Sequence, residues 1–136
     1  MPDDAIAVVR RIYDAFGQRD FAVIRQVIDP DIEIEYEGVV LDAQGTYRGY
    51  EGMGKLLATI LEGFDVDSFD VHVEDIFEVR DGLVVAALHQ RGVGRTSGAA
   101  VEIRIAQAWT IKGGTAIRWH IFRDLPHARE ALGIPE

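Results

Sequence analysis

The chain has 136 residues, of which 48% are hydrophobic, and a net charge of −9 from 14 basic and 23 acidic side chains. This length is enough for one domain with a real core, residues 1–136, and too short for two. The negative charge argues against nucleic acid as a partner, because phosphate backbones would be repelled. The sequence has no cysteine, which excludes disulfides and thiolate chemistry.

The same bulk properties argue against a metal, a cofactor and a membrane. Zinc would have to be held by four scattered histidines and by carboxylates, so we expect no metal and no cofactor. The longest apolar run, Leu83 to Leu88, is far shorter than the roughly 20 residues of a membrane helix. The N-terminus lacks the basic region and apolar core of a secretory signal. We therefore expect no membrane partner and a cytoplasmic location.

Two short helices are predicted at the start of the chain. Asp3 or Asp4 can cap the first helix, and Asp20 can cap the second. The pair Asp29-Pro30 is expected to end the second helix, because a proline disfavours helical backbone in the residue before it. The first helix has an apolar face at helical spacing, and Tyr13 therefore lies on its buried side. That face consists of Ile6, Val9, Tyr13 and Phe16.

A strand, a loop and a third helix are predicted next. From Asp31 the apolar period changes to two, which indicates a half-buried strand. Its glutamates, Glu33, Glu35 and Glu37, are interpreted as a solvated face that protects a sheet edge. Residues 38–52 contain many glycines and little periodicity, so we expect a loop that covers the mouth of a cavity. A helix with a continuous apolar stripe should then run from Met53 to about Gly63.

The rest of the chain is typical of a long antiparallel meander. The apolar phase shifts at Glu74-Asp75, which predicts a bulge that bends the strand. Asp81-Gly82 is a hairpin signal, residues 96–98 form a looser turn, and His127 to Leu132 can form a terminal helical turn. Helices followed by such a meander favour an α+β domain in which a bent antiparallel sheet packs on the N-terminal helices as a cone.

The hairpin of residues 101–124 carries the candidate site. Gln107 occupies the apolar row of its first strand, where an amide must find partners or incur a cost of about 1–3 kcal/mol. If Gly113-Gly114 forms a two-residue turn, Lys112 pairs with Thr115 and Gln107 lies opposite His120.

The inward face of the second strand depends on the register of this turn. In the two-residue register, Arg118, Phe122 and Asp124 share the face of His120. A one-residue bulge in the Gly113-Gly114 turn would instead turn Trp119 and Arg123 inward and His120 and Asp124 outward.

Several short motifs, in this order and spacing, are similar to those of a known family. They are VVRRIYDAF at 8–16, RDF at 19–21, IDPDIE at 28–33, YRGYEG at 47–52, Trp109 before a glycine turn, FRD at 122–124 and EALG at 130–133. Together they resemble the SnoaL-like branch of the nuclear transport factor 2 (NTF2) superfamily, almost from end to end. The resemblance implies a cone-shaped NTF2-like domain, commonly a homodimer, with a hydrophobic pocket for a small apolar molecule.

The resemblance leaves the chemistry open, because relatives include polyketide cyclases, ketosteroid isomerases, limonene epoxide hydrolases and noncatalytic binding proteins. The isomerase constellation is absent: Ile12, Tyr36 and Gln107 stand where those enzymes have the helical tyrosine, the base and the oxyanion aspartate. The epoxide hydrolase pattern is absent too, since Arg104 does not lie between aspartates. In SnoaL-type cyclases an aspartate at the end of the last strand is the acid/base residue, and Asp124 lies in the comparable position.

The predicted site has three catalytic candidates and an apolar lining. His120 can shuttle protons or serve only as a structural partner of Gln107. Asp124 can be the general base or can cap the terminal turn. Gln107 can donate its amide to a ligand carbonyl or satisfy only the backbone. The ligand-binding candidates are Tyr13, Tyr36, Trp109 and Phe122.

Two functions remain open at this point. The first is a cofactor-independent isomerase, cyclase or lyase that acts on a carbonyl compound by general acid-base chemistry. The second is a noncatalytic small-molecule-binding homodimer. In the two-residue register Trp119 faces outward, and with Ala106, Ala108 and Ile121 it would form the exposed apolar patch of a dimer interface.

Overall fold

The computed structural model describes residues 4–38 and 40–134. Its helices are α1 (Ala5–Gln18), α2 (Phe21–Val27), α3 (Gly49–Leu61) and α4 (Leu125–Leu132), with short 3-10 turns η1 (Leu41–Ala43) and η2 (Val66–Ser68). Its strands are β1 (Ile28–Glu37), β2 (Gly45–Arg48), β3 (Asp70–Arg80), β4 (Leu83–Val93), β5 (Ala100–Lys112) and β6 (Thr115–Phe122). The expected α+β class is confirmed.

The first two helices begin at their predicted caps. The Asp4 carboxylate accepts a hydrogen bond from the backbone N–H of Ile6 at 3.0 Å. The Asp20 carboxylate accepts a hydrogen bond from the backbone N–H of Val23 at 3.2 Å. Both bonds satisfy N–H groups in the first turn that have no partner within the helix. The alternative cap, Asp3, lies outside the described residues. On α1 the fully buried residues are Ala5, Val8, Val9, Ile12 and Ala15. The predicted face is therefore rotated slightly, and Tyr13 is only partly buried.

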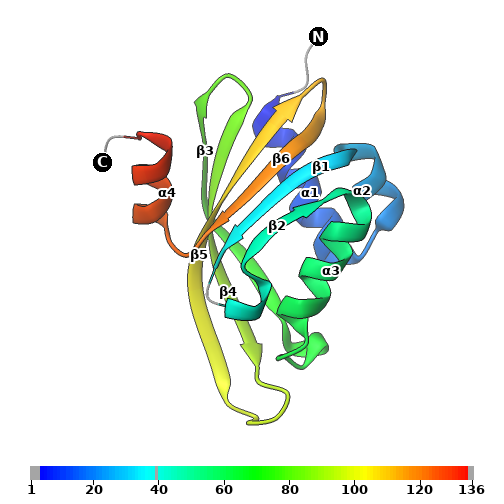
Figure 1. Ribbon diagram of the computed structural model, residues 1–136, viewed down its shortest axis with the longest axis vertical. Coiled ribbons are helices and arrows are strands. Elements are labelled where there is room, and N and C mark those ends of the chain that lie inside the picture. The colour runs from blue at the N-terminus through cyan, green and yellow to red at the C-terminus, as the bar shows by residue number, and fades with distance from the viewer. Residues whose placement is uncertain (1–3, 39, 135–136) are drawn as a thin grey trace.

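The six strands form one sheet in the order β2-β1-β6-β5-β4-β3. Four of its five pairings are antiparallel, as predicted, and the bulge predicted near Glu74 is present as a register shift between Val73 and Asp75. The fifth pairing, between β1 and β6, is parallel. The prediction of an entirely antiparallel sheet was therefore wrong for this one pair of strands, which are far apart in the sequence and adjacent in the sheet (Figure 1).

Two predicted boundaries between residues 28 and 52 were wrong. Asp29 and Pro30 lie inside β1, not at the end of α2. Pro30 is tolerated there because the pairing of β1 with β6 is irregular between Ile28 and Glu33, so no regular ladder needs its missing N–H. Within the predicted loop, residues 45–48 form the edge strand β2, and α3 already begins at Gly49.

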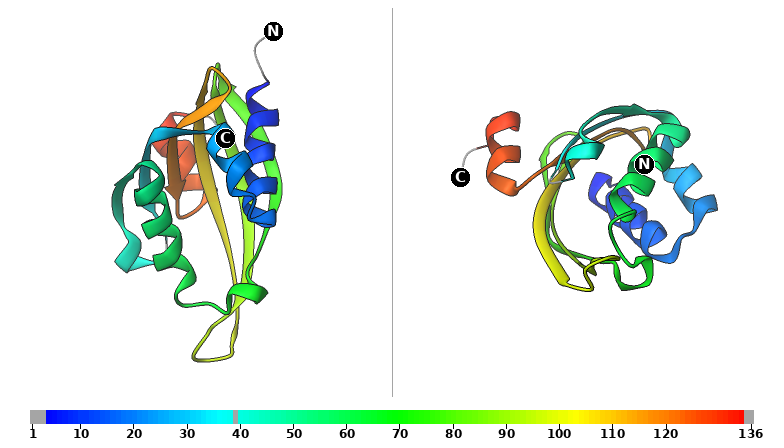
Figure 2. Two further views of the ribbon diagram at one scale, coloured as in Figure 1. Left: turned by 90° about the vertical axis from the view of Figure 1, so that its right-hand side faces the viewer. Right: turned by 60° about the horizontal axis from the view of Figure 1, so that its bottom comes forward.

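The bent sheet separates the helices into two groups. On the concave side α1 contacts β3 to β6, and α3 contacts β1 and β2; the sheet curves around these helices, while α4 lies outside the curve (Figure 2). The large core lies between the sheet and α1 to α3, and a smaller cluster lies between the convex face and α4. Within residues 4–38 and 40–134, none of the helices has the length and apolar character needed to cross a membrane.

Candidate functional site

The turn between β5 and β6 has the predicted form but not the predicted register. Gly113 and Gly114 both have positive φ, 60° and 81°, as a two-residue hairpin turn of type I′ requires, and Lys112 pairs with Thr115. Beyond the turn, however, the register shifts between Ile111 and Thr110, because Ile117 is an extra residue in β6. Such a bulge turns every later side chain of β6 to the opposite face.

The shifted register decides which side chains meet. Gln107 pairs with Ile121 and not with His120, so the predicted pairing was wrong. Trp119 pairs with Trp109, and both indoles lie on the concave face in a stack with ring centroids 4.6 Å apart. Trp119 and His120 have the orientations of the bulged alternative, but the bulge lies at Ile117 and not in the Gly113-Gly114 turn, where it was predicted. The predicted exposed patch around Trp119 is therefore absent, since Trp119 is only 2% exposed.

Three of the predicted site residues meet on the concave face. The indole N–H of Trp109 donates to the Tyr13 hydroxyl at 2.8 Å, and this hydroxyl donates to Gln107 Oε1 at 2.8 Å. An indole nitrogen can only donate, so the hydrogen bonds run in one direction, from Trp109 through Tyr13 to Gln107. The helix α1 supplies Tyr13, and β5 supplies the other two.

The Tyr13 hydroxyl is a donor at neutral pH. Although the ring is partly exposed, its hydroxyl is buried, and this burial raises the pKa of the phenol above its usual range; the hydrogen bond from Trp109 opposes the shift but is the weaker effect. The proton therefore stays on the oxygen and remains shared with Gln107.

Two N–H groups beside this cluster have no hydrogen-bond partner among the described residues. The Gln107 amide uses its oxygen for Tyr13, and no described residue accepts from its nitrogen. Trp119 Nε1 is buried and likewise unpaired within the described chain. Because Trp119 stacks on Trp109 and also on Phe16, at 5.9 Å between ring centroids, its indole is held in place. The concave face thus offers hydrogen-bond donors in an aromatic setting.

The other two predicted lining residues do not join this cluster. Tyr36 is buried at the end of β1, where its ring lies against Gly38 so closely that any side chain there would clash. Its hydroxyl accepts from the backbone N–H of Val40 at 3.5 Å. Phe122 lies on the convex face with Ala106, Ala108 and Ala128, because the bulge reversed its direction. Its placement in the concave lining was therefore wrong.

His120 also lies on the convex face. Its ring stacks on Phe122 with centroids 3.8 Å apart and an interplanar angle of 18°. Its Nε2 contacts a carboxylate oxygen of Glu37, and its Nδ1 lies 3.6 Å from a carboxylate oxygen of Glu35. The neighbouring strand β1 supplies both glutamates. His120 therefore has carboxylate partners, and the expected partnership with Gln107 is absent.

Asp124 caps α4, which is the structural role that the sequence left open for it. Its carboxylate accepts hydrogen bonds from the backbone N–H of His127 at 2.9 Å and from the His127 ring at 2.6 Å. The backbone hydrogen bond is the main reason why the pKa of Asp124 lies below its usual value; desolvation opposes it. A general base activated by burial would show the opposite shift. Arg123, which the bulged alternative turned inward, is exposed.

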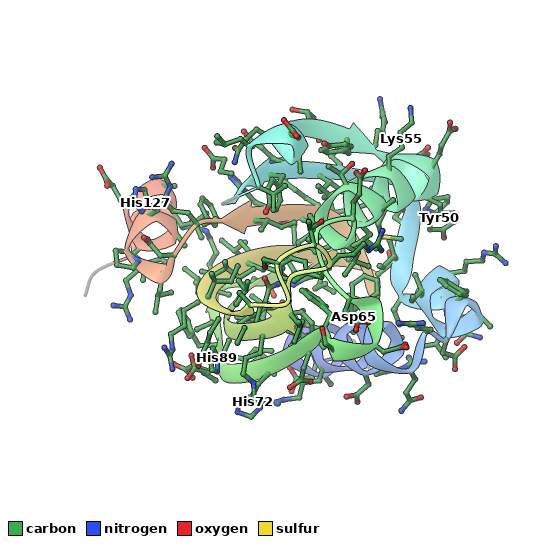
Figure 3. The ribbon with its side chains drawn as sticks, turned by 90° about the horizontal axis from the view of Figure 1, so that it is seen from below. Tyr50, Lys55, Asp65, His72, His89 and His127 are labelled. Carbon is green, nitrogen blue, oxygen red and sulfur yellow. The ribbon has the colours of Figure 1, made fainter. Side chains whose placement is uncertain are left out.

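The ionisable groups near the sheet are concentrated on its outside. His72 and His127 point away from the space between sheet and helices (Figure 3). Among the hollows on the surface, one of about 320 Å³ lies beside Glu37, Phe122 and His127, and another of about 510 Å³ lies beside Asp65 and Arg95. Neither hollow includes Gln107 in its lining. An inward Trp119 was predicted only as an alternative, and the convex grouping of Glu35, Glu37 and His120 was not predicted at all. That grouping follows from the bulge together with the parallel pairing of β1 and β6.

The comparison with known proteins now assigns the family. Residues 9–119 match the SnoaL-like domain. The chain belongs to the SnoaL-like family. A curated relative, the uncharacterized protein Rv0034 of Mycobacterium tuberculosis, is 31% identical over 133 residues, which cover 97% of this chain and 98% of that protein. The counterpart Mb0035 of Mycobacterium bovis matches equally well.

Solved structures agree with this family at the level of the fold. An NTF2-like protein of unknown function from Burkholderia pseudomallei superposes with a TM-score of 0.76 at 15% identity, covering 94% of this chain and 96% of that chain. IdmH of Streptomyces antibioticus, provisionally assigned as a polyketide cyclase, gives 0.75 at 21%, covering 96% and 99%. TerC, crystallised with polyporic acid, gives 0.75 at 20%, covering 95% and 98%. These likenesses confirm the NTF2-like cone.

Proposed function

We propose that this SnoaL-like protein binds a small apolar carbonyl compound on the concave face of its sheet. The observation that carries the proposal is the directed chain of hydrogen bonds from Trp109 through Tyr13 to Gln107, which ends in an unpaired amide N–H. Gln107 is 5% exposed, and its amide nitrogen has no acceptor among the described residues. A ligand oxygen would supply that acceptor in an apolar setting, where a hydrogen bond is stronger than in water.

The donors specify the kind of oxygen. Gln107 Nε2 and Trp119 Nε1 can only donate, so a carbonyl or enolate oxygen matches them, and a group that also donates gains less. The aromatic rings of Phe16, Trp109 and Trp119 provide apolar contact for the body of such a ligand.

Binding without chemistry is favoured by the absence of a base. Among residues 4–38 and 40–134, Gln107 is the only polar residue that is buried, so no buried carboxylate or imidazole faces the cluster. Acid-base catalysis requires a titratable group within reach of the proton that it moves.

A second candidate is a cofactor-independent cyclase or isomerase. The polyketide-cyclase assignment of the structural neighbour IdmH supports it, and Gln107 is placed to stabilise an enolate oxygen. His120 and Asp124, the predicted acid-base residues, lie on the convex face and at the α4 cap, so this candidate needs another group to move the proton of a ligand bound beside Gln107. Turnover that depends steeply on pH, is lost in Gln107→Leu and is kept in His120→Phe would support catalysis on the concave face, whereas ligand binding with no conversion would exclude it.

Native mass spectrometry of the freshly purified protein tests the binding proposal. We expect the native protein to carry an extra mass that denaturation releases as an apolar, carbonyl-containing compound. Gln107→Leu should lower the occupied fraction at least fivefold, because the ligand oxygen loses its donor. The matched control is Gln26→Leu, which removes an exposed amide from α2. Equal occupancy in both variants, or a released compound with no oxygen acceptor, contradicts the proposal.

The same spectrum tests the assembly. The family resemblance implies a homodimer, which remains part of this proposal, as does the cytoplasmic location. A mass of twice 15.1 kDa is expected for the native protein. A spectrum that contains only the single chain at micromolar concentration contradicts the dimer and leaves the ligand result unaffected.

A further inference from the structure

The parallel pairing of β1 and β6 brings two carboxylates and an imidazole together on the convex face. In this register Glu35 lies beside His120 and Glu37 lies beside Phe122. Alternate residues of a strand share a face, so Glu35 and Glu37 project on the same side as His120. One ligand atom from each of the three residues lies within 4.8 Å of the other two.

The His120 imidazole is fixed in orientation, whereas the exposed side chains of Glu35 and Glu37 can change their conformation. Stacking on Phe122 fixes the plane of the His120 ring, whose side chain is 21% exposed, while those of Glu35 and Glu37 are 56% and 53% exposed. The next glutamate, Glu33, forms a separate ion pair with Arg118 at 3.1 Å. No described lysine or arginine pairs with Glu35 or Glu37, so His120 is their one partner here.

We propose that Glu35, Glu37 and His120 bind one divalent transition-metal ion, and that zinc fits this ligand set best. Zinc accepts imidazole nitrogen together with carboxylate oxygen, whereas magnesium and calcium prefer oxygen ligands alone. Three protein ligands leave a coordination position open. The site lies on the sheet face opposite to Gln107 and is independent of the proposed binding function.

The proposed metal site adjoins a surface hollow. Glu37 lines this hollow of about 320 Å³, together with His127 and Glu130 from α4. Water or a small anion in this hollow would complete the coordination. No metal was expected from the sequence, because the histidines are scattered along the chain. The parallel pairing of β1 and β6, whose partners Glu33 and Arg118 are 85 positions apart, brings the three ligands together.

Isothermal titration of the tag-free, EDTA-treated protein with zinc chloride at pH 7.5 tests the site. We expect one zinc ion per chain. His120→Ala should weaken binding at least tenfold, and the isosteric Glu37→Gln should weaken it severalfold while circular dichroism stays native. If His120→Ala does not fold, Glu37→Gln decides the question.

The matched control is His89→Ala. His89 is also on the convex face, but it contacts one carboxylate, that of Glu102. We expect its removal to change zinc affinity less than twofold. The proposal is overturned if zinc binds without stoichiometry, if His89→Ala weakens binding as much as His120→Ala, or if magnesium chloride competes at the same concentration as zinc. Those outcomes would leave Glu35, Glu37 and His120 as an ion-paired surface cluster.

Discussion

The two faces of one bent sheet differ in the kind of polar group that they hold. On the concave face the polar groups are neutral, with Tyr13 and Gln107 hydrogen-bonded among aromatic rings. On the convex face histidines contact carboxylates, as in the pairs His120–Glu37 and His89–Glu102. Neutral groups can be desolvated at a modest cost when they are paired, whereas charges stay at the surface. The concave face is therefore suited to binding a neutral ligand, and these histidine–carboxylate pairs lie on the convex face.

A single residue maintains this separation. Because Ile117 is extra in β6, Trp119 faces inward and His120 outward. Without the bulge, the indole would face solvent and the imidazole would lie beside Gln107. If this contrast is right, substitutions on the concave face should lower the free energy of unfolding more than substitutions on the convex face.

The largest effect is expected for Trp109→Ala on the concave face. Trp109 is fully buried, stacks on Trp119 and donates to Tyr13. Removing it leaves a cavity, which should cost about 3–5 kcal/mol. Urea unfolding followed by far-ultraviolet circular dichroism measures the change. A cost below about 1 kcal/mol, typical of a surface substitution, would mean that the concave face is not packed as described.

A smaller loss is expected for Tyr13→Phe. The ring remains, but the Trp109 indole N–H and Gln107 Oε1 both lose their partner, at a cost of about 1–3 kcal/mol for buried groups left unpaired. The double variant Tyr13→Phe with Gln107→Leu should recover part of this loss, because the amide no longer needs a partner. Strictly additive losses in urea titrations would show that the three groups are not coupled.

Next in size is Asp124→Ala, which removes the cap of α4 and should cost about 1 kcal/mol at neutral pH. The folded-state pKa of Asp124 is lowered, so its carboxylate stabilises the fold above its unfolded pKa of about 3.9, and that stability is lost as the pH falls through the folded pKa. The difference between the native protein and the variant should therefore be constant from pH 7 to 5 and shrink in more acidic buffer. Thermal melts across this range measure it, and a difference that grows in acid contradicts the assignment.

The smallest effect is expected on the convex face, for Arg118→Ala. Its ion pair with Glu33 is well exposed on both sides, at 64% and 52%, and such pairs contribute about 0–1 kcal/mol. We expect a loss below about 0.5 kcal/mol that disappears in 1 M sodium chloride. A loss as large as that of Tyr13→Phe would remove the contrast between the faces.

Much of the fold could be predicted from local signals. The caps Asp4 and Asp20, the bulge near Glu74 and the turn at Gly113-Gly114 each depend on chemistry within a few residues. The edge strand β2 could not be predicted, because four residues carry too short a pattern. The parallel neighbour of β1 was also beyond reach, since no local pattern indicates which strand returns beside it.

The site was predicted in part. Tyr13, Gln107 and Trp109 were expected on one face because periodicity places them there, and they do meet. His120 and Phe122 were placed on the wrong face by one unrecognised extra residue, since the side-chain period of a strand is two. Nothing in the sequence marks Ile117, between Ala116 and Arg118, as an extra residue, and the bulge becomes visible only when β6 is paired with β5.

The pairing of β1 with β6 also has a consequence for synthesis. Glu33 and Arg118 are 85 positions apart, so when the chain emerges from the ribosome, the edge of β1 that pairs with β6 stays open until β6 has been synthesised. During this interval its inward residues, Ile32 and Ile34 among them, could pair with strands of other nascent chains. The alternating glutamates of β1 oppose that association, because charged side chains on an open edge disfavour pairing between molecules. Glu35 and Glu37, which contact His120 in the folded protein, therefore also disfavour aggregation of the chain during its synthesis.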